Sequence, residues 1–281
     1  MIGRSRLSRV VAASLLLLPS LSLLRAQGTP AAPVAVRHTW ALRNLQFGAC
    51  VDFLMDPGSA AAQLEVGFQP VPASRVPGLS TQLKYVVSGD TLYASWIPAR
   101  LCFLDYASVT SGEHLIDPEG DDNSSMIGYW GIAARRVGTG NGGDEEAIVQ
   151  WWTSHWRVRQ TSELAYIPMK VVDRSRGKVP ESTRDRYQVK IGKTIITWEG
   201  TLPTDSSAVA APLVATLVFD GQRKTAWTAH AVLTPRWIRP LSGVLRVEGK
   251  DDLAKALRAS PIRVFGPLYS GGDGRVEFFR P

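Results

Sequence analysis

Few side chains in this sequence have the types and spacing that chemistry requires, and the most suggestive is a single lysine. The stretch "SELAYIPMKVV", residues 162–172, places Lys170 two residues after Pro168 within an apolar run. An amine attacks carbonyl groups when an apolar pocket or a neighbouring cation lowers its pKa. Lys170 is therefore either a working amine held in a pocket or an ordinary lysine at the edge of a strand.

The other reactive residue types are not spaced for catalysis or for metal binding. The chain has no Gly-x-Ser-x-Gly motif, and no serine, histidine and aspartate are spaced as a triad. Four histidines are present, none in the paired spacing of a structural zinc site. His230, in "AWTAHAVL", falls on the strand face opposite Trp227, where it either lines a cavity or faces solvent. We therefore expect no metal site and no cofactor.

Two loops have the outline of ligand-binding motifs but lack the residues that those motifs need. In "IDPEGDDNSS", residues 116–125, an EF-hand register puts Asp122 where glycine is required and Gly128 where glutamate is required. In "VGTGNGGDEEA", residues 137–147, the expected helix begins with three acidic residues that would repel a phosphate. The sequence thus predicts an exposed acidic loop and no nucleotide site.

The first 26 residues have the pattern of a secretory signal peptide. Arg4, Arg6 and Arg9 precede an apolar segment, residues 10–24, and small or polar residues follow it. Serines and a proline interrupt this segment, which is shorter than the roughly 20 apolar residues that a spanning helix needs. The alternative is an uncleaved N-terminal anchor. We expect residues 1–26 to be removed, no membrane span to remain, and the protein to be periplasmic or extracellular.

Removal of this segment also changes the charge argument. The segment holds four arginines and no acidic residue, so its loss lowers the formal net charge from +7 to +3. No compact cluster of lysine and arginine remains of the kind that binds nucleic acid. We therefore expect no nucleic-acid partner.

The two cysteines lie in strand-like segments, Cys50 in "FGACVDFL" and Cys102 in "ARLCFLDY". In an exported chain two cysteines favour a disulfide, and two buried free thiols are the alternative. A disulfide closing a loop of this length stabilises the fold by about 4 kcal/mol in the chain-entropy model.

Strand signals dominate the rest of the chain. After an alanine- and proline-rich flexible lead-in, residues 27–36, short runs of branched and aromatic residues alternate with glycine, proline, aspartate and asparagine. "FDGQRK" and "KIGKTI" have the pattern of hairpin turns. Many strands with few helices predict a mainly β fold. We expect residues 37–281 to form a single closed, cone-like β-barrel with one or two short helices.

Two segments have helical patterns. In "GDEEAIVQWWTSHW", residues 143–156, Ile148, Trp151, Trp152 and His155 recur at helical spacing. Trp151, Trp152 and Trp156 would form either a stacking platform for sugars or lipids or a helix face seated on the barrel. The second segment is "DDLAKALRA", residues 251–259, which an aspartate can cap.

The lysine segment with its flank, "SELAYIPMKVVDRSRGKV", resembles a segment of the acetoacetate decarboxylase-like family. In that family a strand carries Arg-Glu-x-x-Gly-Phe-Pro-Lys-Lys and a hairpin follows. With the prolines matched, Glu163 takes the glutamate position, Ile167 the phenylalanine position and Lys170 the second lysine position. The resemblance implies a closed cone-like barrel with an internal pocket.

The chain departs from the family at the residues that perform the reaction. The resemblance implies that the first lysine forms a Schiff base with a β-keto acid, and here that position is Met169. The family's acidic residue in an earlier strand would fall at Gly131, in "MIGYWGIAA". Because side chains alternate along a strand, an inward Met169 directs Lys170 away, unless a bulge at Pro168 shifts the register. Decarboxylation of the family type is therefore not expected.

These observations favour an exported, non-enzymatic barrel that binds a small apolar or weakly acidic ligand. One alternative is a Schiff-base lyase or decarboxylase that acts on an oxo-acid through Lys170, with Glu163 as a second catalytic residue. Another is an envelope structural or partner-binding protein that uses the tryptophan-bearing helix as its interface. The expected ligand pocket is lined by Ile167, Met169, Trp198, Trp227 and His230.

Overall fold

The computed structural model describes residues 35–116, 124–138, 145–202, 204–221 and 224–280. The predicted signal peptide, most of the lead-in, the acidic part of the calcium-like loop and most of the glycine-rich loop lie outside these ranges. Contacts group the chain from Val34 onward into one compact unit. Among the described residues, no helix combines the length and the apolar character needed to cross a bilayer.

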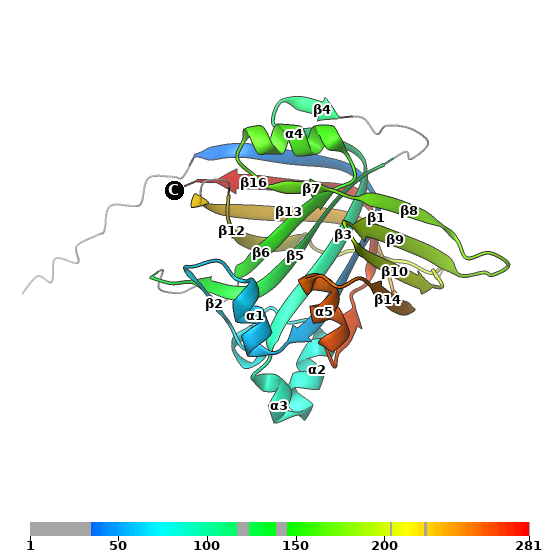
Figure 1. Cartoon of the computed structure of the whole chain (residues 1–281). Helices are drawn as coiled ribbons and strands as arrows, with labels where there is room; N and C mark the ends of the chain where they lie inside the picture. Colours follow the sequence, from blue (N-terminus) through cyan, green and yellow to red (C-terminus); the bar gives the residue numbers. More distant parts are fainter. Residues whose placement is uncertain (1–34, 117–123, 139–144, 203, 222–223, 281) are drawn as a thin grey trace, which may run out of the picture. The chain divides into compact units, whose positions relative to one another are not determined.

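The main sheet closes on itself through a ring of seven strands (Figure 1), as expected for a barrel. Neighbouring strands in the ring are antiparallel except β6 and β12, which run parallel. The ring follows the order β1 (Val36–Met55), β16 (Leu268–Phe279), β13 (Ala226–Arg239), β12 (Leu213–Asp220), β6 (Glu145–Thr153), β5 (Ser125–Arg136) and β3 (Ile97–Ser111). The predicted mainly β, closed architecture is confirmed.

Short strands and helices lie around this ring. Five strands extend the main sheet: β2 (Phe68–Pro70), β4 (His114–Ile116), β7 (Met169–Val171), β11 (Ser207–Ala208) and β15 (Arg263–Phe265). The described residues contain more helices than the one or two expected: α1 (Pro57–Gln63), α2 (Thr81–Gly89), α3 (Thr91–Ala94), α4 (Trp156–Leu164) and α5 (Asp252–Ala259).

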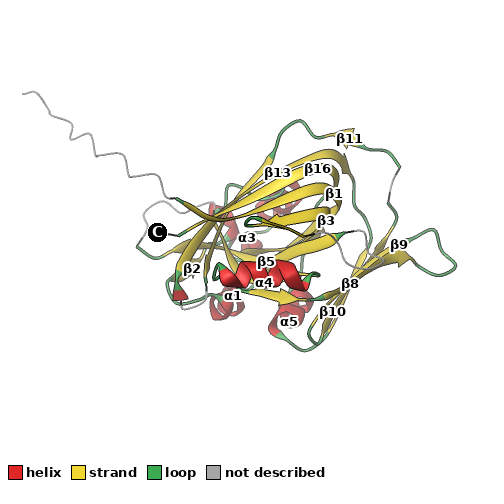
Figure 2. Cartoon of the chain, turned by 90° about the horizontal axis from the view of Figure 1, so that it is seen from above, coloured by secondary structure: helices red, strands yellow, loops and turns green. Residues whose placement is uncertain are grey.

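A second sheet packs against the outside of the barrel. It contains β8 (Asp173–Lys178), β9 (Asp185–Ile191), β10 (Thr194–Gly200) and β14 (Val244–Glu248), and β8 to β10 lie together beside the main sheet (Figure 2). The ring of Tyr187 stacks on that of Phe47 at 4.5 Å between centroids. A buried ion pair joins the layers, with Arg174 Nη1 3.4 Å from Asp105 Oδ2, and the Tyr187 hydroxyl donates to Asp105 Oδ1 at 3.0 Å.

The helix predicted for residues 143–156 is wrong, because Glu145–Thr153 form strand β6 in the barrel wall. Opposite β5, Gly131 pairs with Ile148 and Trp130 pairs with Gln150, so one extra residue bulges from β6. The bulge puts Ile148 and Trp151, three residues apart, into the same buried cluster. Trp152 is buried on the opposite face, in the layer under the second sheet. Because both faces of β6 are buried and the strand contains a bulge, its apolar residues recur at the spacing that is typical of a helix.

Other local predictions are confirmed. Helix α5 begins after Asp251, whose side chain accepts a hydrogen bond from Ala254 N at 2.9 Å, and it buries Leu253 and Leu257. The "KIGKTI" segment joins β9 to β10, with Gly192 at a φ of 60°. Strands β12 and β13, on either side of "FDGQRK", pair antiparallel.

The predicted disulfide is present between Cys50 and Cys102. The two residues are direct partners in the antiparallel pairing of β1 with β3. The bond therefore fixes the register of the two longest strands of the ring.

Candidate ligand-binding site

The lysine segment follows helix α4 and returns to the barrel wall as β7. Tyr166 has a φ of 65° at the turn, and β7 then runs parallel to β6 with Met169 opposite Trp151. Met169 is buried in the barrel interior, whereas Lys170 is exposed. The expected alternation is confirmed, and no bulge brings Lys170 inside.

Aromatic side chains fill the interior around Met169. Trp151 packs edge-to-face against Trp40 at 5.2 Å and against Phe219 at 5.9 Å between ring centroids. Trp40 in turn contacts Phe278 at 4.5 Å. Met169 belongs to the same buried cluster. The position where the family resemblance implies a reactive lysine is therefore part of a packed apolar core.

The residues predicted to line one ligand pocket lie in three different places. Ile167 and Trp227 are buried in the interior cluster with Met169. Trp198 belongs to the separate layer between the barrel and the second sheet. His230 is exposed on the outer face of β13, with its ring 5.0 Å from that of Phe279. The structure does not bring these five residues together.

A polar cluster that the sequence analysis missed lies inside the barrel, on four different strands. Arg100 on β3 donates from Nε to Asp52 Oδ1 on β1 at 2.7 Å. Its Nη1 lies 3.9 Å from Glu146 Oε2 on β6. The Tyr129 hydroxyl on β5 donates to the same Glu146 oxygen at 3.3 Å.

One signal in the sequence could have revealed half of this cluster. Asp52 follows Cys50 by two residues, and Arg100 precedes Cys102 by two. If the cysteines face each other across antiparallel strands, Asp52 and Arg100 must also face each other on the same side of the sheet. The structure shows this pairing. Glu146 had no such signal, because its segment was interpreted as a helix.

Burial and charge set the protonation behaviour of the cluster. Burial raises the pKa of Glu146 to about 7 from its ordinary value of 4.5; the positive charge of Arg100 opposes this shift, and the charge of Asp52 adds to it. Burial by itself would lower the pKa of Arg100, but the negative charges of Glu146 and Asp52 have a larger combined effect and raise this pKa. Burial also raises the pKa of Tyr129 above its usual range. Near neutral pH, Glu146 therefore exchanges a proton while Arg100 stays charged.

Glu146 owes its position to the absence of a side chain at Gly131. A Cβ on Gly131 would overlap the Glu146 carboxyl group and lie 2.6 Å from its Cγ. The family resemblance implies that the family's acidic residue would fall at Gly131, and this match stays a prediction. Glu146, on the neighbouring strand, thus places its carboxyl group directly beside Gly131.

Three members of the polar cluster, all except Tyr129, line a cavity of about 480 Å³. Asp52, Arg100, Glu145 and Glu146 supply its charged side. The rest is largely apolar and comes from the segment before α2, from α2 itself, from β3 and from β12: Val76, Pro77, Leu79, Leu83, Pro98, Ala99, Val214 and Ala215. Apolar walls with a few polar groups are typical of small-molecule sites.

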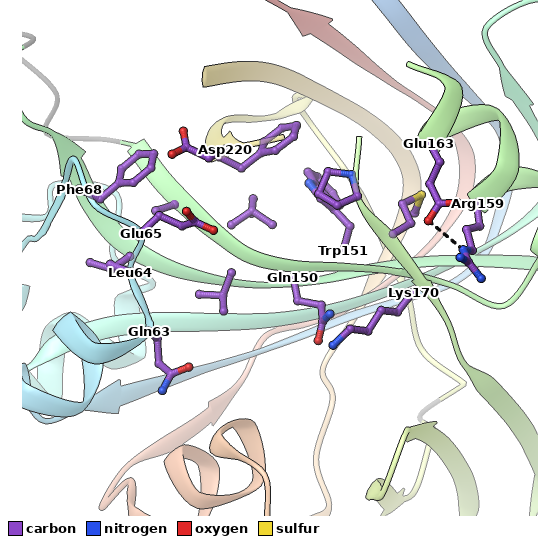
Figure 3. Close-up of a pocket in the computed structure, with 16 residues that line it drawn as sticks. Gln63, Leu64, Glu65, Phe68, Gln150, Trp151, Arg159, Glu163, Lys170 and Asp220 are labelled. Carbon is purple, nitrogen blue, oxygen red and sulfur yellow. Dashed lines mark hydrogen bonds and ion pairs between the residues drawn. The ribbon is translucent and has the colours of Figure 1, made fainter. Parts of the chain in front are cut away.

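A second hollow of about 470 Å³ lies against β6, β7 and the end of β12 (Figure 3), and we call it the outer cleft. Both residues predicted to be catalytic, Lys170 and Glu163, line it. Glu163 is paired with Arg159, whose Nε lies 3.0 Å from Glu163 Oε1. Trp151 and Phe219 of the interior cluster also reach this cleft.

Comparisons with known proteins agree with this architecture. No protein-family model and no curated protein matches the chain. Acetoacetate decarboxylase from Legionella pneumophila subsp. pneumophila str. Philadelphia 1 is similar in structure, with a TM-score of 0.51 and 11% identity over 90% of this chain and 92% of that one. The chain has an acetoacetate decarboxylase-like fold.

Two further solved structures are similar to the chain. One is the enduracididine biosynthesis enzyme MppR complexed with pyruvate, with a TM-score of 0.48, 14% identity and 96% of both chains covered. The other is an acetoacetate decarboxylase-like enzyme from Sphingomonas wittichii RW1, with a TM-score of 0.42, 10% identity, and 96% of this chain and 98% of that one covered. The acetoacetate decarboxylase-like fold is all that identities this low establish.

Proposed function

We propose that this chain is an exported, non-enzymatic binding protein that holds a small, mostly apolar, weakly acidic molecule in the cavity beside Arg100 and Glu146. The observation that carries the proposal is the partly buried Asp52–Arg100–Glu146 cluster at one side of a largely apolar cavity of about 480 Å³. Charged side chains inside a protein need ion-pair or hydrogen-bond partners. Here the three side chains pair with one another and also border a cavity, where a ligand could supply further partners.

The cluster favours an acidic head group. The Arg100 to Glu146 distance of 3.9 Å is longer than a hydrogen bond, so an oxygen of the ligand can approach both groups. With its pKa near 7, Glu146 can carry a proton when an anion arrives and donate it to the ligand oxygen. The apolar wall then buries the body of the ligand.

The non-enzymatic part of the proposal rests on Met169. A thioether cannot form an imine with a keto acid, so the Schiff-base route implied by the family resemblance has no amine at that position. Lys170, the next residue, is exposed on the other side of β7.

The proposed export rests on the N-terminal segment and on the disulfide. Arg4, Arg6 and Arg9 before an apolar segment form a secretory pattern. The Cys50–Cys102 bond suits an oxidising compartment. Cell fractionation with mass spectrometry of the mature N-terminus tests this, and a full-length chain in the cytoplasmic fraction would contradict it.

Ligand binding is tested by thermal unfolding and native mass spectrometry with octanoate, phenylacetate and their uncharged alcohol analogues. We expect the acids to raise the melting temperature and the alcohols to raise it less, because only the acids engage Arg100. Arg100→Lys should weaken acid binding about tenfold or more, since lysine lacks the planar fork of donors. Arg43→Lys, which alters an exposed ion pair with Asp273, is the matched control. Equal shifts with acids and alcohols would overturn the acidic part of the proposal.

A second candidate function is a lysine-dependent lyase, favoured by one observation: Lys170 lines a cleft that also contains a carboxylate, Glu163. It predicts that borohydride traps an oxo-acid on Lys170, mapped by peptide mass spectrometry, and that Lys190 on the second sheet remains unmodified. Absence of an adduct on Lys170 rejects this candidate and leaves the binding proposal untouched.

A further inference from the structure

We propose that the outer cleft is a second binding site, for a linear zwitterion whose amine and carboxylate stand at opposite ends, the charge pattern of a short peptide. This site is separate from the cavity beside Arg100, and the inference goes beyond the function proposed above. It rests on the distribution of charges along the cleft and on its apolar floor.

Opposite charges lie toward the two ends of the outer cleft. Figure 3 shows Glu65 and Asp220 toward one end, and Lys170 with the paired Arg159 and Glu163 toward the other. A molecule with both charges on one carbon would reach only one end. A molecule that separates its amine from its carboxylate by a chain can reach both.

The basic end has one cation available for an anionic group. Arg159 is already paired with Glu163 at 3.0 Å. Lys170 is exposed, and among the described residues it forms no ion pair. A carboxylate beside Lys170 would also lie near the side-chain amide of Gln150, which lines the same part of the cleft (Figure 3).

The acidic end has the complementary arrangement. Asp220 is mostly buried and lies 3.4 Å from Arg136 Nη1, and Arg136 in turn lies over the ring of Phe68 at 4.6 Å. Glu65 is exposed and, within the described part of the chain, has no ion-pair partner. One carboxylate is thus compensated by protein, and Glu65 remains for an ammonium group.

The floor between the two ends can hold an apolar chain. Ile148, Met169, Phe219 and the Trp151 indole line it, and all four are buried members of the interior cluster. Trp151 Nε1 is buried and finds no hydrogen-bond acceptor among the described residues.

The experiment measures binding of zwitterions of increasing length to the purified mature protein. Glycine, 4-aminobutanoate, 6-aminohexanoate and 8-aminooctanoate are titrated by calorimetry and by ¹H–¹⁵N NMR, with the indole resonance assigned through Trp151→Phe. Hexanoate and hexylamine, which carry one charge each, are the matched single-charge probes. We expect the longer zwitterions to shift the Trp151 resonance, and this resonance should report tighter binding at the outer cleft for them than for glycine or for either single-charge probe.

Two variants separate the two ends of the cleft. Lys170→Gln should weaken binding of 6-aminohexanoate and hexanoate up to about fivefold and leave hexylamine unchanged, as expected for an exposed charge pair. Glu65→Gln should weaken 6-aminohexanoate and hexylamine and leave hexanoate unchanged. Lys190→Gln, on the second sheet, is the control for a change of net charge.

Some results would overturn the inference. One is that the zwitterions bind no more tightly at the outer cleft than the single-charge probes. Another is that both variants weaken the binding of every probe equally. A third is that no probe binds at millimolar concentration. Glu146→Gln, in the other cavity, should leave the binding of 6-aminohexanoate and the shift of the Trp151 resonance unchanged, whereas any hexanoate bound beside Arg100 is expected to respond to it. A loss of 6-aminohexanoate binding in Glu146→Gln would assign the probe to that cavity and also contradict the inference.

Discussion

The carboxyl group of Glu146 occupies the space that a side chain on Gly131 would need. These residues lie on neighbouring strands of the ring, and a Cβ on Gly131 would come within 2.6 Å of Glu146 Cγ. The bulge in β6 and the missing side chain on β5 together admit a buried carboxyl group beside Arg100. The relationship explains how the barrel accommodates the carboxyl group of Glu146 beside Arg100.

Substitution of Gly131 tests this relationship directly. Gly131→Ala should lower the free energy of unfolding by about 1–3 kcal/mol, because the added methyl overpacks the interior. In a Glu146→Ala background the same substitution should cost much less, since the carboxyl group that it meets is gone. Urea denaturation of the four proteins in this double-mutant cycle measures the coupling. Equal costs in the two backgrounds would show that the residues do not compete for space.

The raised pKa of Glu146 predicts a particular pH dependence of stability. A carboxyl group whose folded pKa is about 7 and whose unfolded pKa is near 4.5 favours the folded state fully below pH 4.5. That contribution is lost as the pH rises through 7. Glutamine in Glu146→Gln resembles the protonated acid at every pH, so the variant does not lose this stability as the pH rises. The stability of the variant minus that of the wild type should therefore grow by about 3 kcal/mol from pH 4.5 to pH 8.

The measurement for this prediction is urea denaturation of both proteins across that pH range. Burial lowers the pKa of His38 to about 4, so His38 contributes with the opposite sign, its stabilisation being lost as the pH falls below 6.5. Both proteins contain His38, and its effect cancels in the difference. A difference that stays flat with pH would show that Glu146 ionises normally.

Reduction of the disulfide should destabilise the barrel. The bond links residues 52 positions apart, which corresponds to about 4 kcal/mol in the chain-entropy model. Urea denaturation with and without dithiothreitol measures the loss. The double variant Cys50→Ala with Cys102→Ala should unfold as easily as the reduced protein and show no response to dithiothreitol. If reduction left stability unchanged, the bond would not constrain the unfolded chain.

Breaking the buried ion pair between the barrel and the second sheet should lower the free energy of unfolding more than breaking an exposed pair. Asp105→Asn takes the carboxylate from Arg174 and Tyr187, and we expect a loss of about 3–5 kcal/mol because a buried charge loses this partner. Lys255→Gln, which removes the exposed pair with Asp252, should cost less than about 1 kcal/mol. Similar small losses in both variants would mean that water reaches Arg174 once Asp105 is changed.

Several features of this protein follow from local sequence. Short branched and aromatic runs between turn residues predict a strand-rich fold, and Asp251 before an amphipathic segment predicts α5. Alternation along a strand separates Met169 from Lys170 whatever the strand pairs with. These features depend on neighbours in the chain, so the sequence by itself was sufficient.

The candidate sites depend on contacts between residues far apart in the chain. Trp151 and Trp152 are buried on opposite faces of one strand, and the bulge beside them disturbs the period of two, so their spacing predicted a helix. Trp198 is apolar like the residues of the interior, but its strand belongs to the outer layer. The sequence alone determined the strand-rich class and helix α5, favoured the cysteine pair, and predicted that Met169 and Lys170 point to opposite faces unless a bulge intervenes. Only the tertiary structure decided that Glu146 meets Arg100, because strand pairing and the space above Gly131 are set by the closed ring as a whole.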